Sequence, residues 1–197
     1  IFAPIHWNGQ TSANANVSNC FSSRTDSLSG QPDSKYVAVK LTPVNTAKHV
    51  QIFSVKELNL PLDYWSKVKL QQGFEYIAAH SKPLGSVLDW CQTLDVTGSW
   101  SYFENGNNLS STVICCDKGS LVFAAYFHSK RQLLNSDWMD ELLAQEQLQD
   151  TQLGQLLTSE LPAEFKNGKA VCSCFQVGEN QITEAIKDQG LNTLESL

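Results

Sequence analysis

Two cysteines close to the end of the chain have the spacing of a metal-ligating pair. Cys172 and Cys174 form a C-x-C motif ahead of a predicted helix over residues 180–189. Backbone N–H groups and the positive end of the dipole at a helix start favour the thiolate form of cysteine. Iron–sulfur clusters are held by thiolates, usually four of them. The motif therefore predicts half of an iron–sulfur site.

A second group of residues suited to chemistry lies in the polar stretch within residues 2–41. Its side chains are mostly Ser, Asn and Thr, and the cations Arg24 and Lys35 are accompanied by only two acids, Asp26 and Asp33. Many hydrogen-bond donors with two cations suit a phosphorylated or highly oxygenated ligand. A solvated linker is the alternative interpretation, because long loops in compact domains are usually either functional or disordered.

The ends of this stretch indicate how it is held. Residues 1–5 form a short apolar run, and residues 35–41 alternate polar and apolar side chains as a half-buried strand does. We therefore expect a sheet that presents a long irregular loop to a ligand. The chain starts at Ile1, in what we interpret as mid-strand, so we also expect a fragment or a processed form of a longer protein.

Three marks follow one another over the first fifth of the chain. They are an F-x-P-x-H-W opening, a D-x-x-S-G-Q-P-x-S-K run and a closing A-V-K strand. This stretch resembles the end of the dinucleotide-binding domain of bacterial molybdopterin oxidoreductases, specifically the assimilatory nitrate reductase branch. The resemblance implies a segment of a double-psi β-barrel that helps to hold bis(molybdopterin guanine dinucleotide).

The same resemblance implies which residues contact that cofactor. By position, Lys35 matches a lysine that contacts the cofactor, and Ser18 falls about where the family has a cofactor-binding Asn. Asn16 and Asn19 lie close to Ser18 in the sequence and belong to the same candidate set. His6-Trp7 lies where related periplasmic enzymes carry an aromatic pair near the substrate funnel.

The surroundings of the C-x-C motif carry a second resemblance. The run V-C-x-C-F-x-V-G-E-x-x-I-x-x-A-I is similar to the bacterioferritin-associated ferredoxin-like module found at the end of many assimilatory nitrate reductases. That module binds a 2Fe-2S cluster through this pair and a later C-x-x-C, and this chain stops at Leu197 before a second pair. We expect Cys172 and Cys174 to ligate metal in the longer protein, and to be free, oxidised or sharing an adventitious metal here.

Composition narrows the classes of protein that the chain can represent. It has 197 residues, of which 42% are hydrophobic and 17% charged, as in folded soluble proteins. The formal net charge is -6 and no basic cluster occurs, which weighs against a general nucleic-acid binder. No run approaches the ~20 apolar residues that span a bilayer.

The other cysteines and histidines form no recognisable site in the sequence. Cys115 and Cys116 are adjacent in a predicted strand, and burial as structural thiols is the favoured interpretation. His80 and His128 have no carboxylate or cysteine at ligand spacing, so we expect no chemical role for either. The cysteine spacings are poor for disulfides, which indicates a reducing compartment. No nucleophile elbow and no phosphate-binding glycine loop occurs.

Hydrophobic patterning predicts an α+β fold. We expect strands over residues 50–55, 74–79, 100–103, 112–116 and 121–128, and helices over 84–94, 138–149 and 180–189. This order predicts a central antiparallel sheet with helices on one face, preceded by the partial double-psi β-barrel segment and followed by a small helical C-terminal segment. The predicted domains are 1–43 for the dinucleotide-binding end, 44–165 for an α+β domain without an assigned role, and 166–197 for the start of the 2Fe-2S module.

The two resemblances together imply the C-terminal portion of a cytoplasmic, molybdenum-dependent assimilatory nitrate reductase, which reduces nitrate to nitrite. The full-length protein would hold the molybdopterin cofactor and the 2Fe-2S cluster. This fragment alone would need neither, would contain no catalytic residue and would be inactive. The implied partners are the upstream catalytic part of the same chain and an electron donor such as ferredoxin, flavodoxin or an NADH-dependent reductase, without nucleic acid or membrane. A non-catalytic binding or docking module and a formate-dehydrogenase-like molybdopterin oxidoreductase are the alternatives.

Overall fold

The structure, a computed structural model, describes residues 9–14, 25–30, 40, 45–106, 110–128, 133–160, 162, 170–172 and 177–189. The chain divides into two units, Ile1–Ser159 and Glu160–Leu197. The described part of the smaller unit consists of β8 (Ala170–Cys172), β9 (Val177–Gly178) and α4 (Glu179–Gln189). All other elements belong to the larger unit.

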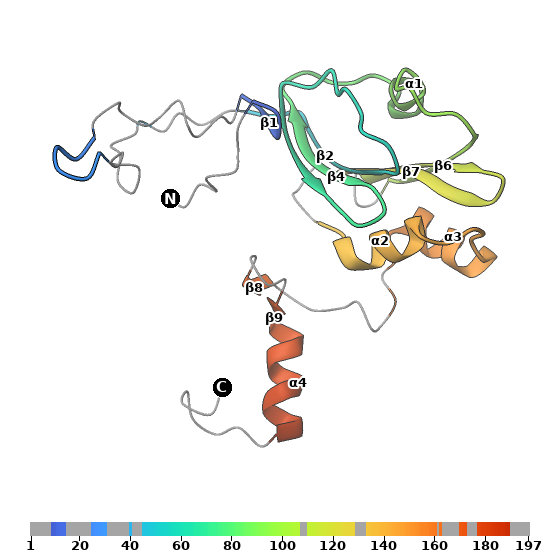
Figure 1. Cartoon of the computed structure of the whole chain (residues 1–197). Helices are drawn as coiled ribbons and strands as arrows, with labels where there is room; N and C mark the ends of the chain where they lie inside the picture. The colour runs from blue at the N-terminus through green and yellow to red at the C-terminus, as the bar shows by residue number, and fades with distance from the viewer. Residues whose placement is uncertain are drawn as a thin grey trace. The chain divides into compact units, whose positions relative to one another are not determined.

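An antiparallel sheet is the centre of the larger unit (Figure 1), and seven of its strands lie in the described residues. They are β1 (Ser12–Ala13), β2 (Lys48–Ser54), β3 (Tyr64–Lys69), β4 (Phe74–His80), β5 (Ser99–Asn105), β6 (Ser110–Asp117) and β7 (Ser120–His128). Their order across the sheet is β1-β3-β4-β2-β7-β6-β5. The helices of this unit are α1 (Val87–Gln92), α2 (Ser136–Leu143) and α3 (Asp150–Thr158). The predicted α+β class is therefore confirmed.

Helices cover both faces of this sheet, and our expectation of helices on one face is wrong. Phe127 of β7 packs edge-on against Trp90 of α1, with ring centroids 5.9 Å apart. The preceding residue, Tyr126, donates its hydroxyl hydrogen to the Met139 Sδ atom of α2 at 3.9 Å. Successive strand residues point to opposite faces. Because β7 is apolar on both sides, each face needs a cover, and Figure 1 shows α1 on one side with α2 and α3 on the other.

The larger core lies on the α1 face. Leu58, Leu60 and Leu62, from the segment between β2 and β3, are buried there together with the apolar side of α1. Tyr76 of β4 is fully buried in the same core. The Leu58 N–H donates to the Tyr76 Oη at 2.7 Å, and this hydroxyl donates to the Leu58 carbonyl oxygen at 3.3 Å. The buried phenol is therefore satisfied and fixes the crossing segment to β4.

Most of the predicted strands are present, with shifts of one or two residues at their ends, as β2, β4, β5, β6 and β7. The sequence pattern did not predict the short strands β1, β8 and β9, nor the longer strand β3. Lys67 and Lys69 interrupt its apolar character, and Val68 is 46% exposed. Tertiary pairing with β4 forms this strand, and Trp65 contributes an edge-on ring contact with Tyr76 at 6.3 Å.

The helix predicted over 138–149 is displaced at both ends. It starts earlier, because the Asn135 side chain caps it by accepting from the Trp138 N–H at 3.0 Å. It stops at Leu143, because the following residues bind the β6–β7 turn. The Leu148 N–H donates to the Gly119 carbonyl at 2.9 Å, and the Ser120 hydroxyl donates to the Glu146 carbonyl at 2.5 Å. Tertiary hydrogen bonds thus replace the continued helix.

The described part of the predicted dinucleotide-binding segment, residues 1–43, includes β1. Ser12 and Ala13 pair with Ser66 and Trp65 of β3, so this short strand extends the central sheet at one edge. The double-psi β-barrel segment and the three predicted domains stay predictions. The residues described in the smaller unit include the predicted C-terminal helix, present as α4.

Candidate functional site

The residues predicted to contact the dinucleotide lie outside the described part of the chain. They are His6, Trp7, Asn16, Ser18, Asn19 and Lys35, and their roles stay predictions. The described residues do show how Asn14 and Ala47, which flank a stretch that includes Lys35, are attached to the sheet. That attachment is the candidate functional site that the structure adds.

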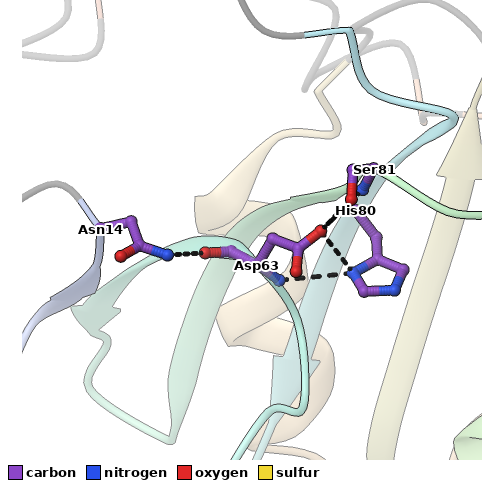
Figure 2. A network of polar contacts seen from close by, with 4 residues as sticks. All are labelled: Asn14, Asp63, His80 and Ser81. Carbon is purple, nitrogen blue, oxygen red and sulfur yellow. Dashed lines mark hydrogen bonds and ion pairs between the residues drawn. The ribbon is translucent and has the colours of Figure 1, made fainter.

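Four side chains at one end of the sheet form a polar network, which we call the loop clamp: Asn14, Asp63, His80 and Ser81 (Figure 2). Asn14 directly follows β1, Asp63 directly precedes β3, His80 ends β4 and Ser81 comes next. Antiparallel pairing of β3 with β4 brings Asp63 next to His80 and Ser81. The Asn14 Nδ2 donates to the Asp63 carbonyl oxygen at 2.6 Å. Asn14 has a φ of 53°, a left-handed conformation that asparagine tolerates well.

The loop clamp holds both ends of residues 14–47, which include four of the predicted cofactor residues, Asn16, Ser18, Asn19 and Lys35. Asn14 is tied to Asp63 at the N-terminal end of that stretch. At its C-terminal end, the Ala47 N–H donates to the His80 carbonyl at 2.9 Å, and β2 then begins at Lys48 opposite His80. Asp63 and His80 contact one another, so residues 14 and 47 are fixed at the same place. The described contacts therefore fix residues 14 and 47 at one end of the sheet, and the loop that the sequence predicts between them stays a prediction.

In the loop clamp the Asp63 carboxylate contacts both Ser81 and His80 and holds these chain segments together. The Asp63 carboxylate accepts from the Ser81 hydroxyl and from the Ser81 N–H, the latter at 2.9 Å. These two hydrogen bonds hold the pKa of Asp63 below its ordinary value, with a smaller contribution from His80. The His80 Nδ1 lies 3.1 Å from the Asp63 Oδ2 and 3.4 Å from its backbone nitrogen.

The contacts in this network do not form a nucleophilic triad. In a Ser-His-Asp relay the imidazole accepts the serine proton while the carboxylate holds the opposite ring nitrogen. Here the Ser81 hydroxyl donates to the Asp63 carboxylate, and His80 approaches the same carboxylate from another direction. The described contacts give His80 a role in attachment, and the expectation that it has no chemical role stays a prediction.

His49 and His128 lie at the same end of the sheet as the loop clamp. They are directly opposite one another in the β2–β7 ladder. The His49 Nε2 shares a hydrogen bond of 3.1 Å with the Thr46 hydroxyl. The His128 Nε2 is buried and has no hydrogen-bond partner among the described residues, and burial followed by the charge of Lys48 lowers the pKa of His128. Cross-strand neighbours of this kind are far apart in the sequence, so spacing rules do not detect them.

The buried carboxyl group of Glu75, on the face of β4 toward α2, anchors the start of that helix. Glu75 is 7% exposed, and its carboxyl oxygens accept from the Gln51 Nε2 at 2.7 Å and from the Ser136 hydroxyl at 2.8 Å. Gln51 in turn accepts from the Leu134 N–H at 2.7 Å and donates to the Leu134 carbonyl at 3.2 Å. Burial raises the pKa of Glu75 although both hydrogen bonds oppose this shift.

We expect Glu75→Gln to gain stability relative to the parent chain as the pH rises. A carboxyl pKa that is higher in the folded than in the unfolded state makes folding bind a proton, so stability falls from about the unfolded value of 4.5 upwards. This loss levels off above the folded pKa, and every tenfold difference in proton affinity between the two states is worth about 1.4 kcal/mol. Glutamine carries no charge. Its Oε1 accepts from the Gln51 Nε2, and its Nε2 donates to the Ser136 hydroxyl oxygen, which reverses the direction of that hydrogen bond.

The measurement is the free energy of unfolding in urea for both chains across a pH series from acid to neutral. Glu141→Gln, which removes an exposed carboxyl from α2, controls for the loss of one charge. A difference between Glu75→Gln and the parent that stays constant over the whole series would contradict this account of Glu75.

The first cysteine of the C-terminal motif lies in a two-stranded sheet. Cys172 is the last residue of β8 and pairs with Val177 of β9, while Cys174 lies outside the described residues. β9 leads directly into α4 at Glu179, and the Gly178 N–H donates to the Gln181 Oε1 at 2.8 Å. A strand thus separates the motif from the helix start. Within the described residues no group of three or more His, Cys, Asp or Glu is placed to hold a metal ion.

The central cysteines are structural, as the sequence predicts. Cys91 and Cys115 are fully buried in the core on the α1 face, and Cys116 is half-buried. Burial raises the pKa of the Cys91 thiol strongly and that of Cys115 to about 11. The reactive form of cysteine is the thiolate, so these thiols are unreactive at neutral pH.

Comparison with known proteins gives one informative match. No protein-family profile matches the chain, and no solved structure matches it. A nitrate reductase of Klebsiella oxytoca is 26% identical over 189 residues, which cover 94% of this chain and 21% of the relative. The chain is thus related to a region of a nitrate reductase. It spans about a fifth of that relative's length.

This match agrees with the nitrate reductase resemblance at the level of a related region. It extends through residues 44–165, to which the sequence motifs assigned no role, because it covers 94% of the chain. Within the described residues no helix is long and apolar enough to cross a membrane. The contacts that sequence reasoning missed are the loop clamp and the Glu75 network, since both join residues that only the strand register brings together.

Proposed function

We propose that this chain is the C-terminal portion of a molybdenum-dependent nitrate reductase that reduces nitrate to nitrite in nitrate assimilation. The observation that carries the proposal is the alignment of nearly the whole chain with a protein named nitrate reductase. The dinucleotide-binding motifs near the start and the C-x-C motif near the end support it, because they occur in the order expected for that enzyme.

In this proposal the N-terminal stretch contributes to binding the guanine dinucleotide of the molybdenum cofactor. Lys35 would hold the cofactor phosphates, with Ser18, Asn16 and Asn19 as further hydrogen-bonding residues and His6-Trp7 close to the substrate path. The loop clamp supports this role, since it fixes both ends of the stretch that contains Lys35 to one end of a rigid sheet. Binding residues on loops that a scaffold positions are a common arrangement.

The C-terminal two-stranded sheet contributes to electron entry in this proposal. Cys172 and Cys174 would supply two of the four thiolates that a 2Fe-2S cluster needs, so the remaining two must come from other residues of the longer protein. A cluster of this kind passes single electrons. The proposed donor is a ferredoxin, a flavodoxin or an NADH-dependent reductase, the proposed partner within the chain is the upstream catalytic part, and the proposed location is the cytoplasm.

The test is the cofactor content of the full-length protein, purified without oxygen. We expect molybdenum, iron and acid-labile sulfide in the parent, together with reduction of nitrate by a small artificial donor. A phosphate contact from lysine is worth about 1.5–3 kcal/mol, so Lys35→Ala should weaken cofactor binding about tenfold or more. Molybdenum occupancy should fall while the iron content stays unchanged. Cys172→Ser should remove one iron–sulfur signal from the paramagnetic resonance spectrum and leave molybdenum unchanged.

The outcomes separate the proposed roles from one another. Unchanged molybdenum occupancy in Lys35→Ala would rule out a cofactor role for that lysine. Unchanged iron–sulfur spectra in Cys172→Ser would rule out the cluster. A full-length protein without molybdenum would favour a non-catalytic docking module, and a molybdenum protein that oxidises formate but does not reduce nitrate would favour the formate-dehydrogenase-like alternative.

A further inference from the structure

One edge of the central sheet is open. β5 is the last strand in the sheet order and pairs with β6 on one side only. Among the described residues no strand pairs with its outer side. Tyr102 is 42% exposed and Phe103 38% exposed on this strand. An exposed edge with large apolar side chains is a template for pairing with another chain.

The opposite edge of the sheet has the protective features that β5 lacks. There β1 covers part of β3, and the Lys67 N–H donates to the Thr11 carbonyl at 2.7 Å. Lys67 and Lys69 place two cations on β3, and charged side chains, lysine above all, discourage pairing of edge strands. β5 has the sequence S-W-S-Y-F-E-N, with no lysine, no proline and one charge at Glu104. The β3 edge therefore carries features that prevent strand pairing. The β5 edge lacks them and is suited to pair with another strand.

We propose that β5 pairs antiparallel with the β5 strand of a second copy of this chain, with Tyr102 at the two-fold axis. Tyr102 is the central residue of Ser99–Asn105, so this register pairs the strand over its full length. Trp100 lies opposite the second copy's Glu104, and Ser101 lies opposite its Phe103. Residues directly opposite one another in an antiparallel ladder point to the same face, so these opposed side chains lie on one face of the joined sheet.

The charge on β5 is compatible with this self-pairing. When the two β5 strands pair over their full length, Glu104 of one copy lies opposite Trp100 of the other copy and not opposite the other Glu104. The two Glu104 residues are separated by four positions along the strand, or about 13 Å, which exceeds the screening length of about 8 Å in physiological salt. Each Glu104 carboxylate is also held on its own strand by the Tyr102 hydroxyl, which donates to it at 2.9 Å. No like charges meet directly.

In this dimer the sheets of the two copies would form one continuous sheet, with the same face of each copy on the same side. Trp100 packs edge-on against Phe123 of β7 at 5.5 Å between ring centroids, so its side of β5 is continuous with the core on the α1 face. Tyr102 lies on this same side, because the two are separated by two positions. In the dimer each Tyr102 ring contacts its mate, and aromatic pairs directly opposite one another stabilise antiparallel strands.

The experiment measures the mass of the 197-residue chain in solution by light scattering and sedimentation across a dilution series. We expect a monomer–dimer equilibrium. Tyr102→Lys places two like charges directly opposite one another and removes the aromatic pair, so it should raise the dimer dissociation constant by about tenfold or more. Val68→Lys is the matched control, because Val68 is 46% exposed on the opposite edge and should leave the dissociation constant unchanged.

A disulfide test identifies the partner strand and its register. Tyr102→Cys should form a disulfide-linked dimer on mild oxidation, because it lies opposite itself, whereas Glu104→Cys should not exceed the parent chain. Circular dichroism and thermal unfolding of each variant confirm that the fold is kept. A chain that stays monomeric at every concentration overturns the proposal, and so does a dimer that Tyr102→Lys leaves intact or that cross-links equally through residue 104.

Discussion

Gly98→Ala should destabilise the protein by about 2–6 kcal/mol, because strain and overpacking each cost about 1–3 kcal/mol. Gly98 directly precedes β5 and has a positive φ of 151°, a conformation that residues with a side chain rarely adopt. A Cβ atom at this position would lie 2.5 Å from the Cys116 carbonyl oxygen and 2.8 Å from the Cys115 Sγ. Backbone cannot move away cheaply, so the start of β5 must shift away from β6.

The measurement is urea unfolding of the 197-residue chain, followed by circular dichroism. Gly154→Ala is the matched control, since Gly154 lies inside α3 and an added Cβ would meet nothing within 4 Å. Alanine in a helix interior is favoured over glycine by about 0.5–1 kcal/mol, so this variant should be slightly more stable than the parent. Equal stabilities of the two variants would contradict the close approach of Gly98 to β6.

Gln51→Leu is expected to cost about 3 kcal/mol or more, although leucine is similar in size and more apolar. Gln51 is 1% exposed, and its amide joins Glu75 to both backbone groups of Leu134. Leucine leaves the Glu75 carboxyl and the Leu134 N–H and carbonyl without these partners. Each unsatisfied buried polar group costs about 1–3 kcal/mol, and charged groups cost more.

Because Leu134 directly precedes the Asn135 cap, this loss should also loosen the start of α2. Hydrogen exchange of the α2 amides is the measurement that shows it, alongside the free energy of unfolding. Gln72→Leu is the control for the chemical change, because Gln72 is exposed and its described hydrogen bond comes from its backbone N–H to Asp140. A surface change of this kind should stay within about 0.5 kcal/mol of the parent. A Gln51→Leu chain as stable as Gln72→Leu would show that the network contributes little.

The sequence predicts those parts of the fold that local pattern determines. Alternating or continuous apolar runs identify β2, β4, β6 and β7, since these strands are buried and their side chains report it. β3 escapes because Lys67 and Lys69 lie in an edge strand, where pairing rather than hydrophobic pattern decides the structure. The predicted continuation of α2 fails because Leu148 and Glu146 bind the β6–β7 turn, a contact between segments distant in the sequence.

The same distinction, between local sequence pattern and contacts of distant segments, applies to the candidate site. Motif spacing located the Lys35 stretch and the Cys172 motif, because those patterns are local. The loop clamp was not predictable, since Asn14, Asp63 and His80 meet only through the β1–β3 and β3–β4 registers. Burial of Glu75 likewise depends on the position of α2 over β4.

The strand order also determines how the protein reaches its fold. β3 pairs with β4, which makes one group of strands that are neighbours along the chain. β5 pairs with β6 and β6 pairs with β7, which makes a second such group. β2 joins the groups, and its pairing of Val50 with Phe127 closes a long loop. Contacts between residues far apart in the chain slow folding, because loop-closure entropy is lost before the contact compensates for it. We therefore expect the pairing of β2 with β7 to form late in folding, and β7 would expose an unpaired edge until it does.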